Sequence, residues 1–382
     1  MQNLLLENAN VVLADEKVEN ASLLIENGKI SKITKAKINS ENAIDLSNCT
    51  IYAGFIDIHN HGAVGVDVNE ANADDLREVG KFLASKGVTV WLPAFVPDAG
   101  ENYRKVVCAI DEVMETQTNE PIAQIVGVHY EGVFANEKMC GALRPEFFKT
   151  FKNGDEINQL PKLKRGVHLT TLAPEIENGI ELIKELHKQN WIVSIGHTNA
   201  DFQTLEAAYD AGAKQITHLF NAMTGVHHRE IGVAGWALTK KDVSCEIIAD
   251  GVHVAPQMLK FAANCKSAAN LMLVSDSIAP TGLGDGEYEI WNDKISVVNN
   301  QTKNERGSIA GSVITMLDAV KMMSSLGFSA TEISQMASGN QAKLLGIEKS
   351  HGSIEVGKRA DLVILDELQN VKLTLIGGKI NL

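Results

Sequence analysis

The sequence has few cysteines, and those it has show no pairing pattern. An odd number of widely spaced cysteines without a C-x-x-C motif excludes the disulfide framework of a small secreted domain and fits a reducing compartment. We therefore expect a cytoplasmic protein. The five cysteines are Cys49, Cys108, Cys140, Cys245 and Cys265.

Long apolar runs are also missing. No segment approaches the roughly 20 consecutive apolar residues that a membrane-spanning helix requires. The N-terminal stretch is interrupted by Glu7 and Asp15, and it lacks the basic start and apolar run of a secretory signal. We therefore expect neither export nor a membrane partner.

Positive charge is in short supply. Lysine and arginine number 35 against 48 aspartates and glutamates, which gives a formal net charge of -13. A nucleic-acid-binding protein needs a cationic surface, so the composition argues against nucleic acid and leaves small substrates open. Hydrophobic residues make up 45% of the chain, which is enough for a large core.

The pattern of apolar and polar residues differs between the two ends of the sequence and its middle. At both ends, short apolar runs alternate with turn signals, which predicts a small β-sandwich domain built from residues 1–52 and 347–382. Residues 53–346 alternate buried strands with amphipathic helices, so we predict a parallel (β/α)8 barrel, the TIM-barrel fold. The eight strand candidates are residues 54–62, 88–96, 123–132, 166–175, 191–198, 214–223, 244–254 and 270–280, and helical spacing is clearest at 73–87, 176–190 and 201–213.

Imidazole and carboxylate side chains gather at the ends of these strands. Active sites of such barrels form at the carboxyl ends of the strands. Histidine, aspartate and glutamate bind Zn²⁺ or Fe²⁺, so several of them at one barrel mouth predict a site for one or two ions. The candidates are His59 and His61 on the first strand, Glu131 on the third, His197 on the fifth, His218 on the sixth and Asp276 on the eighth.

Each candidate also has an ordinary structural role open to it. His197 is compatible with a histidine that enters a helix, Asp276 with a helix cap and Glu131 with a solvated loop carboxylate. Six such residues at the same end of five strands are hard to explain independently. We therefore favour the metal site.

Other polar residues near the strand ends have weaker assignments. His129 shares a strand face with Glu131, where a supporting hydrogen bond fits better than metal ligation. Arg229 in GVHHREIG follows the sixth strand and His253 the seventh. These two residues are suited either to an anion or to a solvated loop.

The motifs around these residues resemble one enzyme family closely. HYEG, SIGHTNA, THLFNAM, HREIG, IIADGVHV and VSDSIAPTG occur in the order and spacing typical of N-acetylglucosamine-6-phosphate deacetylases, members of the amidohydrolase superfamily. GFIDIHNHG and GSIEVGKRADLVILD are typical of the superfamily more broadly. The resemblance covers essentially the whole chain and implies a (β/α)8 barrel with a small β-sandwich from both chain ends.

The resemblance also implies roles for the candidate ligands. Glu131, His197 and His218 match the primary metal ligands of the family, and Asp276 matches its catalytic aspartate. Some members lack the His-x-His pair and use one metal, whereas others keep it and hold two ions with the glutamate between them. Because this sequence keeps the pair in FIDIHNHG, two divalent ions are implied, and nitrogen ligands favour Zn²⁺ or Fe²⁺ over Mg²⁺.

The implied reaction converts N-acetylglucosamine 6-phosphate to glucosamine 6-phosphate and acetate. A bound metal activates water and polarises the amide carbonyl. Asp276 would take the proton from the attacking water and deliver it to the departing amine. Asn221, Ala222, Arg229 and His253 match positions that hold the sugar phosphate. One or two of these reach a neighbouring subunit in the family, so a homodimer is implied.

The sequence departs from the family pattern near the substrate. Where the family has two prolines, this chain has Val133 and Ile231. Where the family has a histidine that contacts the substrate near the acetyl group, this chain has Leu143. Leu143 removes a hydrogen-bond donor, and Arg144 is a candidate to take over its place. A close alternative substrate is therefore another phosphorylated N-acyl amino sugar, such as N-acetylgalactosamine 6-phosphate. A cyclic-amide hydrolase is a weaker alternative, because it would not use the residues that match phosphate-binding positions. A noncatalytic amidohydrolase-like scaffold would be expected to lose metal ligands that this chain keeps.

Overall fold

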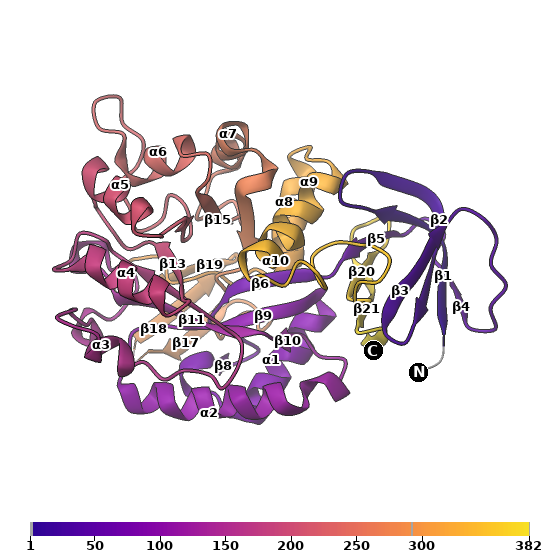
Figure 1. Cartoon of the computed structure of the whole chain (residues 1–382), viewed down its shortest axis with the longest axis horizontal. Coiled ribbons are helices and arrows are strands. Elements are labelled where there is room, and N and C mark those ends of the chain that lie inside the picture. The colour runs from indigo at the N-terminus through magenta and orange to yellow at the C-terminus, as the bar shows by residue number, and fades with distance from the viewer. Residues whose placement is uncertain (1–2, 292, 382) are drawn as a thin grey trace.

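Parallel strands form a barrel in the middle of the chain (Figure 1). The computed structural model describes residues 3–291 and 293–381. Within these residues each barrel strand pairs in parallel with the next, and the last returns to the first, where Asn60 bridges Ser277. The predicted (β/α)8 barrel is therefore confirmed. Its strands are β6 (Phe55–Asn60), β9 (Val88–Phe95), β11 (Gly127–Phe134), β12 (Val167–Leu172), β13 (Ile192–Ile195), β14 (Gln215–Ile216), β15 (Ser244–Ile248) and β16 (Leu271–Val274), and the short β10 (Gln124–Ile125) also pairs with β9.

The barrel strands are short and deeply buried. Every residue of β9 and β11 is buried, as expected for parallel strands covered on both faces. Seven of the eight predicted ranges contain their barrel strand, and β11 runs two residues beyond its predicted range of 123–132. Several of the other strands end earlier than predicted. At residues 214–223 only β14 is regular, because the backbone turns away at His218, Phe220 and Ala222, whose φ angles are 30°, 80° and 49°.

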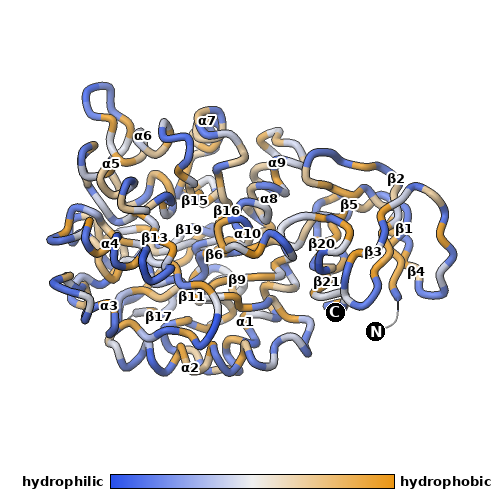
Figure 2. Tube along the Cα trace, viewed as in Figure 1, coloured by the Kyte–Doolittle hydropathy of each residue, from blue (hydrophilic) through white to orange (hydrophobic). Residues whose placement is uncertain are grey.

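Helices surround the barrel (Figure 1), and hydrophobic and hydrophilic residues alternate along them (Figure 2). Three of them, α1 (Ala73–Ser85), α4 (Gly179–Lys188) and α5 (Phe202–Asp210), lie within the predicted helical ranges. The buried residues of α1 and α4 are mostly apolar. α1 begins at a capping box, in which Asn72 and Asp75 exchange side-chain and backbone hydrogen bonds. The other helices are α2 (Gly100–Thr116), α3 (Asp155–Asn158), α6 (Gly232–Thr239), α7 (Pro256–Lys266), α8 (Met316–Ser325), α9 (Ala330–Ser334) and α10 (Asn340–Leu344).

The two chain ends form a second sheet beside the barrel, on the right in Figure 1. It runs in the order β22-β21-β20-β5-β1-β2-β3, with β4 also paired to β1, and it has an apolar core cluster of its own. The predicted small β domain is confirmed, although β1 pairs with β4 and β5 in parallel rather than antiparallel. Leu382 lies outside the described residues, and we propose the domain division at 52/53 and 346/347. The strands are β1 (Leu4–Val12), β2 (Lys17–Glu26), β3 (Lys29–Thr34), β4 (Ala43–Asp45), β5 (Thr50–Ala53), β20 (Leu362–Leu365), β21 (Val371–Ile376) and β22 (Lys379–Asn381).

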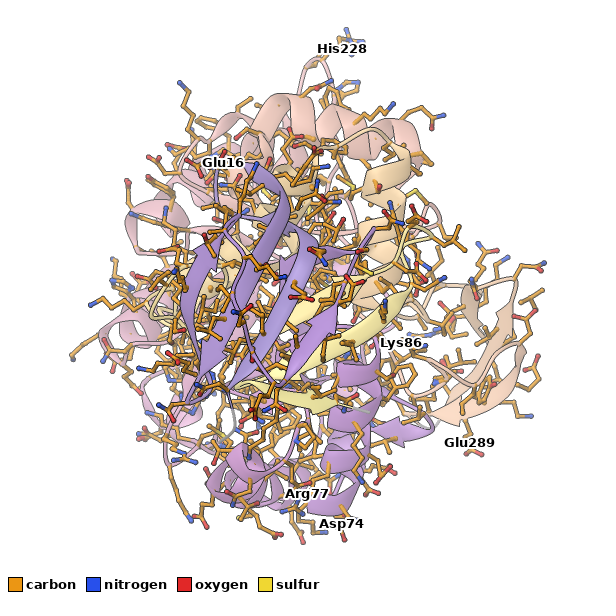
Figure 3. All side chains as sticks on the ribbon, turned by 90° about the vertical axis from the view of Figure 1, so that its right-hand side faces the viewer. Glu16, Asp74, Arg77, Lys86, His228 and Glu289 are labelled. Atoms are coloured by element: carbon orange, nitrogen blue, oxygen red, sulfur yellow. The ribbon has the colours of Figure 1, made fainter. Side chains whose placement is uncertain are left out.

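A third, antiparallel sheet follows the last barrel strand and was not predicted. It consists of β17 (Gly286–Ile290), β18 (Asp293–Val298) and β19 (Gln301–Asn304). Figure 3 shows it projecting from the barrel, with Glu289 at its edge. Its inner side packs Ile290 and Ile295 against Ile278, just after β16. A further two-stranded hairpin, β7 (Gly62–Ala63) and β8 (Val66–Asp67), follows β6.

Across residues 3–291 and 293–381, none of the helices combines the length and apolar character needed to cross a membrane.

Candidate metal centre

The six candidate ligands converge at the carboxyl end of the barrel. All six side chains are buried, with exposures between 0% and 7%. Their ring nitrogens and carboxylate oxygens form two adjoining groups, in each of which the atoms lie within 4.8 Å of one another. One group is Glu131, His197 and His218, and the other is His59, His61 and Asp276.

Three of the six residues hold a left-handed backbone directly after a strand. His197, His218 and Asp276 have φ angles of 48°, 30° and 50°. Such a conformation costs a residue with a side chain about 1–3 kcal/mol and persists where the surrounding structure enforces it. It ends the strand and turns each side chain toward the barrel mouth.

Glu131 lies between the two groups. Its Oε1 is 3.0 Å from His197 Nε2 and 2.9 Å from His218 Nε2. The same carboxylate reaches the other group, with Oε2 3.3 Å from His61 Nε2. On the far side, Asp276 Oδ1 is also 3.3 Å from His61 Nε2. One carboxylate is therefore placed to serve two ions.

The outer ring nitrogens fix the direction of three imidazoles. The Nδ1 atoms of His61 and His197 lie 3.0 Å and 2.9 Å from the Ala94 and Met139 carbonyl oxygens. His59 Nδ1 lies 3.0 Å from Glu246 Oε2. Since these oxygens only accept, each Nδ1 donates to its oxygen, which leaves Nε2 as the atom that faces inward.

The inward-facing nitrogens require positive charge between them. His59 Nε2 and His61 Nε2 are 3.1 Å apart, as are His197 Nε2 and His218 Nε2. Two lone pairs at this distance repel each other unless a cation or a proton lies between them. Nitrogen and carboxylate donors of this kind fit a divalent transition metal.

The ionisation of the cluster points the same way. Burial opposes a charge on Glu131, yet His59, His197 and His218 hold the pKa of its carboxyl well below its usual range. Burial also lowers the pKa of His61, but Asp276 and Glu131 raise it overall to about 9. The carboxylates therefore draw positive charge into a buried site, which a divalent ion can supply.

A cavity of about 320 Å³ opens above five of the six residues, and His59 lies behind its lining. Asn221, Ala222 and His253 line it, as the resemblance implied. Leu143 is also in the lining, where it forms an apolar wall together with Trp291. The cavity therefore joins the metal cluster to one polar and one apolar wall.

Arg144, the candidate to replace the family's histidine, is paired away from the cavity. Its guanidinium is 3.1 Å from Asp98 Oδ2 and donates to the Pro97 carbonyl oxygen at 2.9 Å. Arg144 is absent from the cavity lining, since its guanidinium is engaged by Asp98 and Pro97. The candidate role for Arg144 therefore stays a prediction, which this position of the side chain does not support.

The comparison with known proteins decides the family. The sequence model of the amidohydrolase family matches residues 50–381. The chain belongs to the amidohydrolase family. Members generally depend on divalent metals, in keeping with the two residue groups at the barrel mouth.

Individual relatives of this amidohydrolase are named as amino-sugar phosphate deacetylases. The chain is 33% identical to N-acetylglucosamine-6-phosphate deacetylase of Bacillus subtilis, over 99% of this chain and 97% of that protein. It is also 33% identical to N-acetylgalactosamine-6-phosphate deacetylase of Escherichia coli O157:H7, over 85% and 86% of the two chains.

Solved structures of the same kind superimpose along the whole chain. The N-acetylglucosamine-6-phosphate deacetylase of Thermotoga maritima matches with a TM-score of 0.89 and 32% identity over 99% of both chains. A mutant of the Mycobacterium smegmatis enzyme in complex with N-acetyl-D-glucosamine-6-phosphate matches with a TM-score of 0.91 and 26% identity over 100% of both chains.

Arg229 of this amidohydrolase lies outside the cavity. It is exposed, on the loop that carries His228, which Figure 3 shows at the outer edge of the molecule. Its backbone amide contacts the ring of His227, and its side chain is not part of the cavity lining. Arg229 is therefore not part of the cavity of its own chain in this conformation.

Sequence reasoning missed three residues near the centre. Glu246 on β15 bonds His59, and Asp250 bonds the ring of His253 with 2.6 Å between Oδ2 and Nδ1. Trp291 packs edge-on against His61, with 5.8 Å between ring centroids. Asp250 and His253 share the motif ADGVH, so their spacing was a signal, whereas Glu246 and Trp291 meet the site only through the fold.

Proposed function

We propose that this amidohydrolase is a metal-dependent deacetylase that converts N-acetylglucosamine 6-phosphate to glucosamine 6-phosphate and acetate. One observation carries the proposal. Five of the six imidazole and carboxylate ligands, all but the buried His59, line a cavity that also holds Asn221, Ala222 and His253, which match positions that bind sugar phosphate in this family. The names of the relatives in Bacillus subtilis and Thermotoga maritima support the same substrate.

The ligand groups support two ions per chain. Glu131, His197 and His218 would hold the first, and His59 and His61 the second together with Asp276. Four of the six donors are nitrogens, which favours Zn²⁺ or Fe²⁺ over Mg²⁺. A bound ion would lower the pKa of water and polarise the amide carbonyl.

Asp276 is the residue that would move the proton. Its carboxylate lines the cavity next to His61. Burial opposes its charge, but His59 and His61 lower the pKa of this carboxyl below its usual value, so it is ionised and able to accept a proton. It takes the proton from the attacking water and returns it to the departing nitrogen, since an amine leaves poorly unless it is protonated.

The phosphate group would be held at the polar wall. Asn221, Ala222 and His253 line that wall, and Arg229 of a second copy would complete it in a homodimer. The exposure of Arg229 supports an intersubunit role, as do Phe202 and Val226, which are 55% and 52% exposed near the same loop. The planar guanidinium of arginine suits phosphate because it donates two parallel hydrogen bonds.

N-acetylgalactosamine 6-phosphate is the second candidate substrate. Leu143 in the cavity lining favours it as an alternative, since a hydrogen-bond donor to the sugar is missing there. The relative in Escherichia coli and another from Shewanella, at 31% identity, are named for that sugar. Acetate release should therefore be compared between the two epimers, each with and without the 6-phosphate.

The expected result is fast acetate release from N-acetylglucosamine 6-phosphate and slow release from both unphosphorylated sugars. A higher kcat/KM for the galactosamine epimer would transfer the proposal to that substrate. Equal rates with and without phosphate would reject the phosphate-binding wall.

A noncatalytic scaffold is the rival from another class. Such a protein would not need to retain metal, whereas this chain keeps all six ligands in one buried cluster. Elemental analysis after metal-replete expression separates the two, because fewer than about one ion per chain would favour the scaffold.

The five free cysteines support the proposal that the protein works in the cytoplasm.

A further inference from the structure

A buried carboxylate that the proposed reaction does not use lies behind the metal cluster. Glu246, in the middle of β15, has no exposed surface. Its Oε2 is 3.0 Å from His59 Nδ1, on the side of the ring that faces away from the other ligands. A buried carboxylate is costly unless it is paired or hydrogen-bonded, so this contact calls for a reason.

Glu246 is held in place by a neighbouring strand. Gln215, on β14, donates from Nε2 to Glu246 Oε1 at 2.6 Å. The two strands are adjacent in the barrel, and both residues are buried. Each oxygen of the carboxylate therefore has its own partner, and the group cannot turn away from His59 without losing a buried hydrogen bond.

The support for His59 differs from that of the other ligating imidazoles. The outer nitrogens of His61 and His197 face neutral backbone carbonyls. In the described part of the chain, the outer nitrogen of His218 has no hydrogen-bond partner. His59 alone among these four has a charged acceptor, and a carboxylate behind an imidazole raises its basicity and fixes its orientation toward a metal.

Glu246 is not placed to be a ligand of a third ion. It forms a group with His59 and His129, but both ring nitrogens of His129 are engaged, with Thr171 Oγ1 at 2.8 Å and the Ile58 carbonyl oxygen at 3.2 Å. The 3.0 Å distance to His59 Nδ1 is that of a hydrogen bond. His59 also has only one nitrogen left for a metal, and that nitrogen faces His61.

We propose that Glu246 is a positioning residue that acts through His59 and decides whether the chain retains its second ion. The inference rests on the proposed two-ion site. It adds the group that orients His59 to bind the second ion. Glu246 Oε2 also accepts from the His218 backbone amide, at 3.4 Å. Glu246→Gln keeps an oxygen for that amide, so the affinity of the ion held by Glu131, His197 and His218 should not change when only the charge is removed.

Two substitutions separate charge from shape. Glu246→Gln keeps the size and an acceptor oxygen for His59 but removes the negative charge, and Gln215 has a free carbonyl oxygen that can accept from the new amide. Glu246→Leu removes the acceptor altogether. Ser194→Ala is the matched control, because it deletes another buried hydrogen bond inside the barrel, that to Thr217, without touching a ligand.

The readout is metal affinity, measured by titrating metal-free protein with Zn²⁺ against a competing chelator and by following Co²⁺ absorption spectra. Wild type and Ser194→Ala should bind two ions. In Glu246→Gln one of the two affinities should fall by about 10- to 100-fold while the other is unchanged, and Glu246→Leu should lose that ion. Circular dichroism and Tm report whether each variant is folded.

A double-mutant cycle tests whether the effect passes through His59. His59→Ala should lose the same ion, and adding Glu246→Gln to His59→Ala should cause no further loss of affinity. The inference is overturned if Glu246→Gln binds both ions as tightly as wild type, or if both affinities fall together in a folded protein. A wild-type protein that binds only one ion would instead overturn the proposed two-ion site, and with it the inference.

Discussion

Three of the candidate ligands hold backbone angles that residues with side chains rarely adopt. His197, His218 and Asp276 follow β13, β14 and β16 with positive φ. The cost of about 1–3 kcal/mol for each residue is met by the barrel around them. Strain of this kind fixes the direction of a side chain, which a metal centre and a proton carrier both require.

The role of Asp276 can be tested by an isosteric change. Asp276→Asn keeps the shape of the side chain but removes the group that accepts and returns the proton. We expect the variant to retain metal and to lose about 10²- to 10⁴-fold in kcat for acetate release. Full turnover by a metal-replete Asp276→Asn protein would rule out the role.

His168 should make stability depend on pH, independently of the metal centre. Burial, with Lys162 nearby, lowers the pKa of His168 from 6.5 to about 4, and the ring accepts a hydrogen bond from the Leu163 amide. Between these pH values the unfolded chain binds a proton that the folded chain does not, so stability falls as pH falls from 6.5 toward 4.

His168→Gln keeps an acceptor for the Leu163 amide but does not titrate. The Tm of wild type should therefore drop more steeply than that of the variant as pH is lowered through this window. Parallel Tm curves for the two proteins would show that His168 does not contribute to the acid sensitivity.

Among the elements, the sheet β17–β19 has a direct effect on the cavity. Its turn carries Trp291 onto the edge of His61 and into the apolar wall that also contains Leu143 and Ile309. We expect this wall to face the acyl group, because the polar wall is suited to phosphate. The hairpin would then limit the size of the acyl group.

Trp291→Ala should enlarge that wall. The expected result is a lower kcat/KM for the N-acetyl substrate and a higher rate ratio of N-butanoyl to N-acetyl substrate than in wild type, measured by release of the free amine. An unchanged ratio would mean that the indole does not contact the acyl group.

Some structural elements could be predicted from the sequence and others could not. The barrel strands could be predicted because buried parallel strands read as apolar runs, and the ligands could be predicted because each marks a strand end. Glu246 could not, since 187 residues separate it from His59 and only barrel closure brings them together. The Asn299-Asn300 turn of the missed hairpin, with φ angles of 51° and 62°, was a signal that we did not use.

At the scale of the whole molecule, one of the junctions between the terminal sheet and the barrel is very tight. β5 of the sheet is followed after a single residue, Gly54, by β6 of the barrel. A side chain at Gly54 would lie 2.2 Å from the Thr89 hydroxyl, so only glycine permits this close approach. The terminal sheet thus fixes the start of the strand that carries His59 and leads directly to His61.

Assembly can be tested by mixing two impaired proteins. If Arg229 serves the site of its partner, a heterodimer of Asp276→Asn and Arg229→Ala chains contains one site with an intact Asp276 and an intact partner arginine. Co-expressed chains should therefore show more activity at low substrate than the average of the two variants alone. No gain in a mixture shown to contain heterodimers would place Arg229 outside the partner's site.

The central claim is that the metal cluster and the cavity above it remove an acetyl group from a phosphorylated amino sugar. Proton NMR of metal-replete protein with N-acetylglucosamine 6-phosphate tests it most directly. We predict acetate and glucosamine 6-phosphate in equal amounts, no reaction after chelation, and recovery when Zn²⁺ or Fe²⁺ is restored. A folded, metal-replete protein that releases no acetate from any N-acetylhexosamine 6-phosphate would contradict the claim.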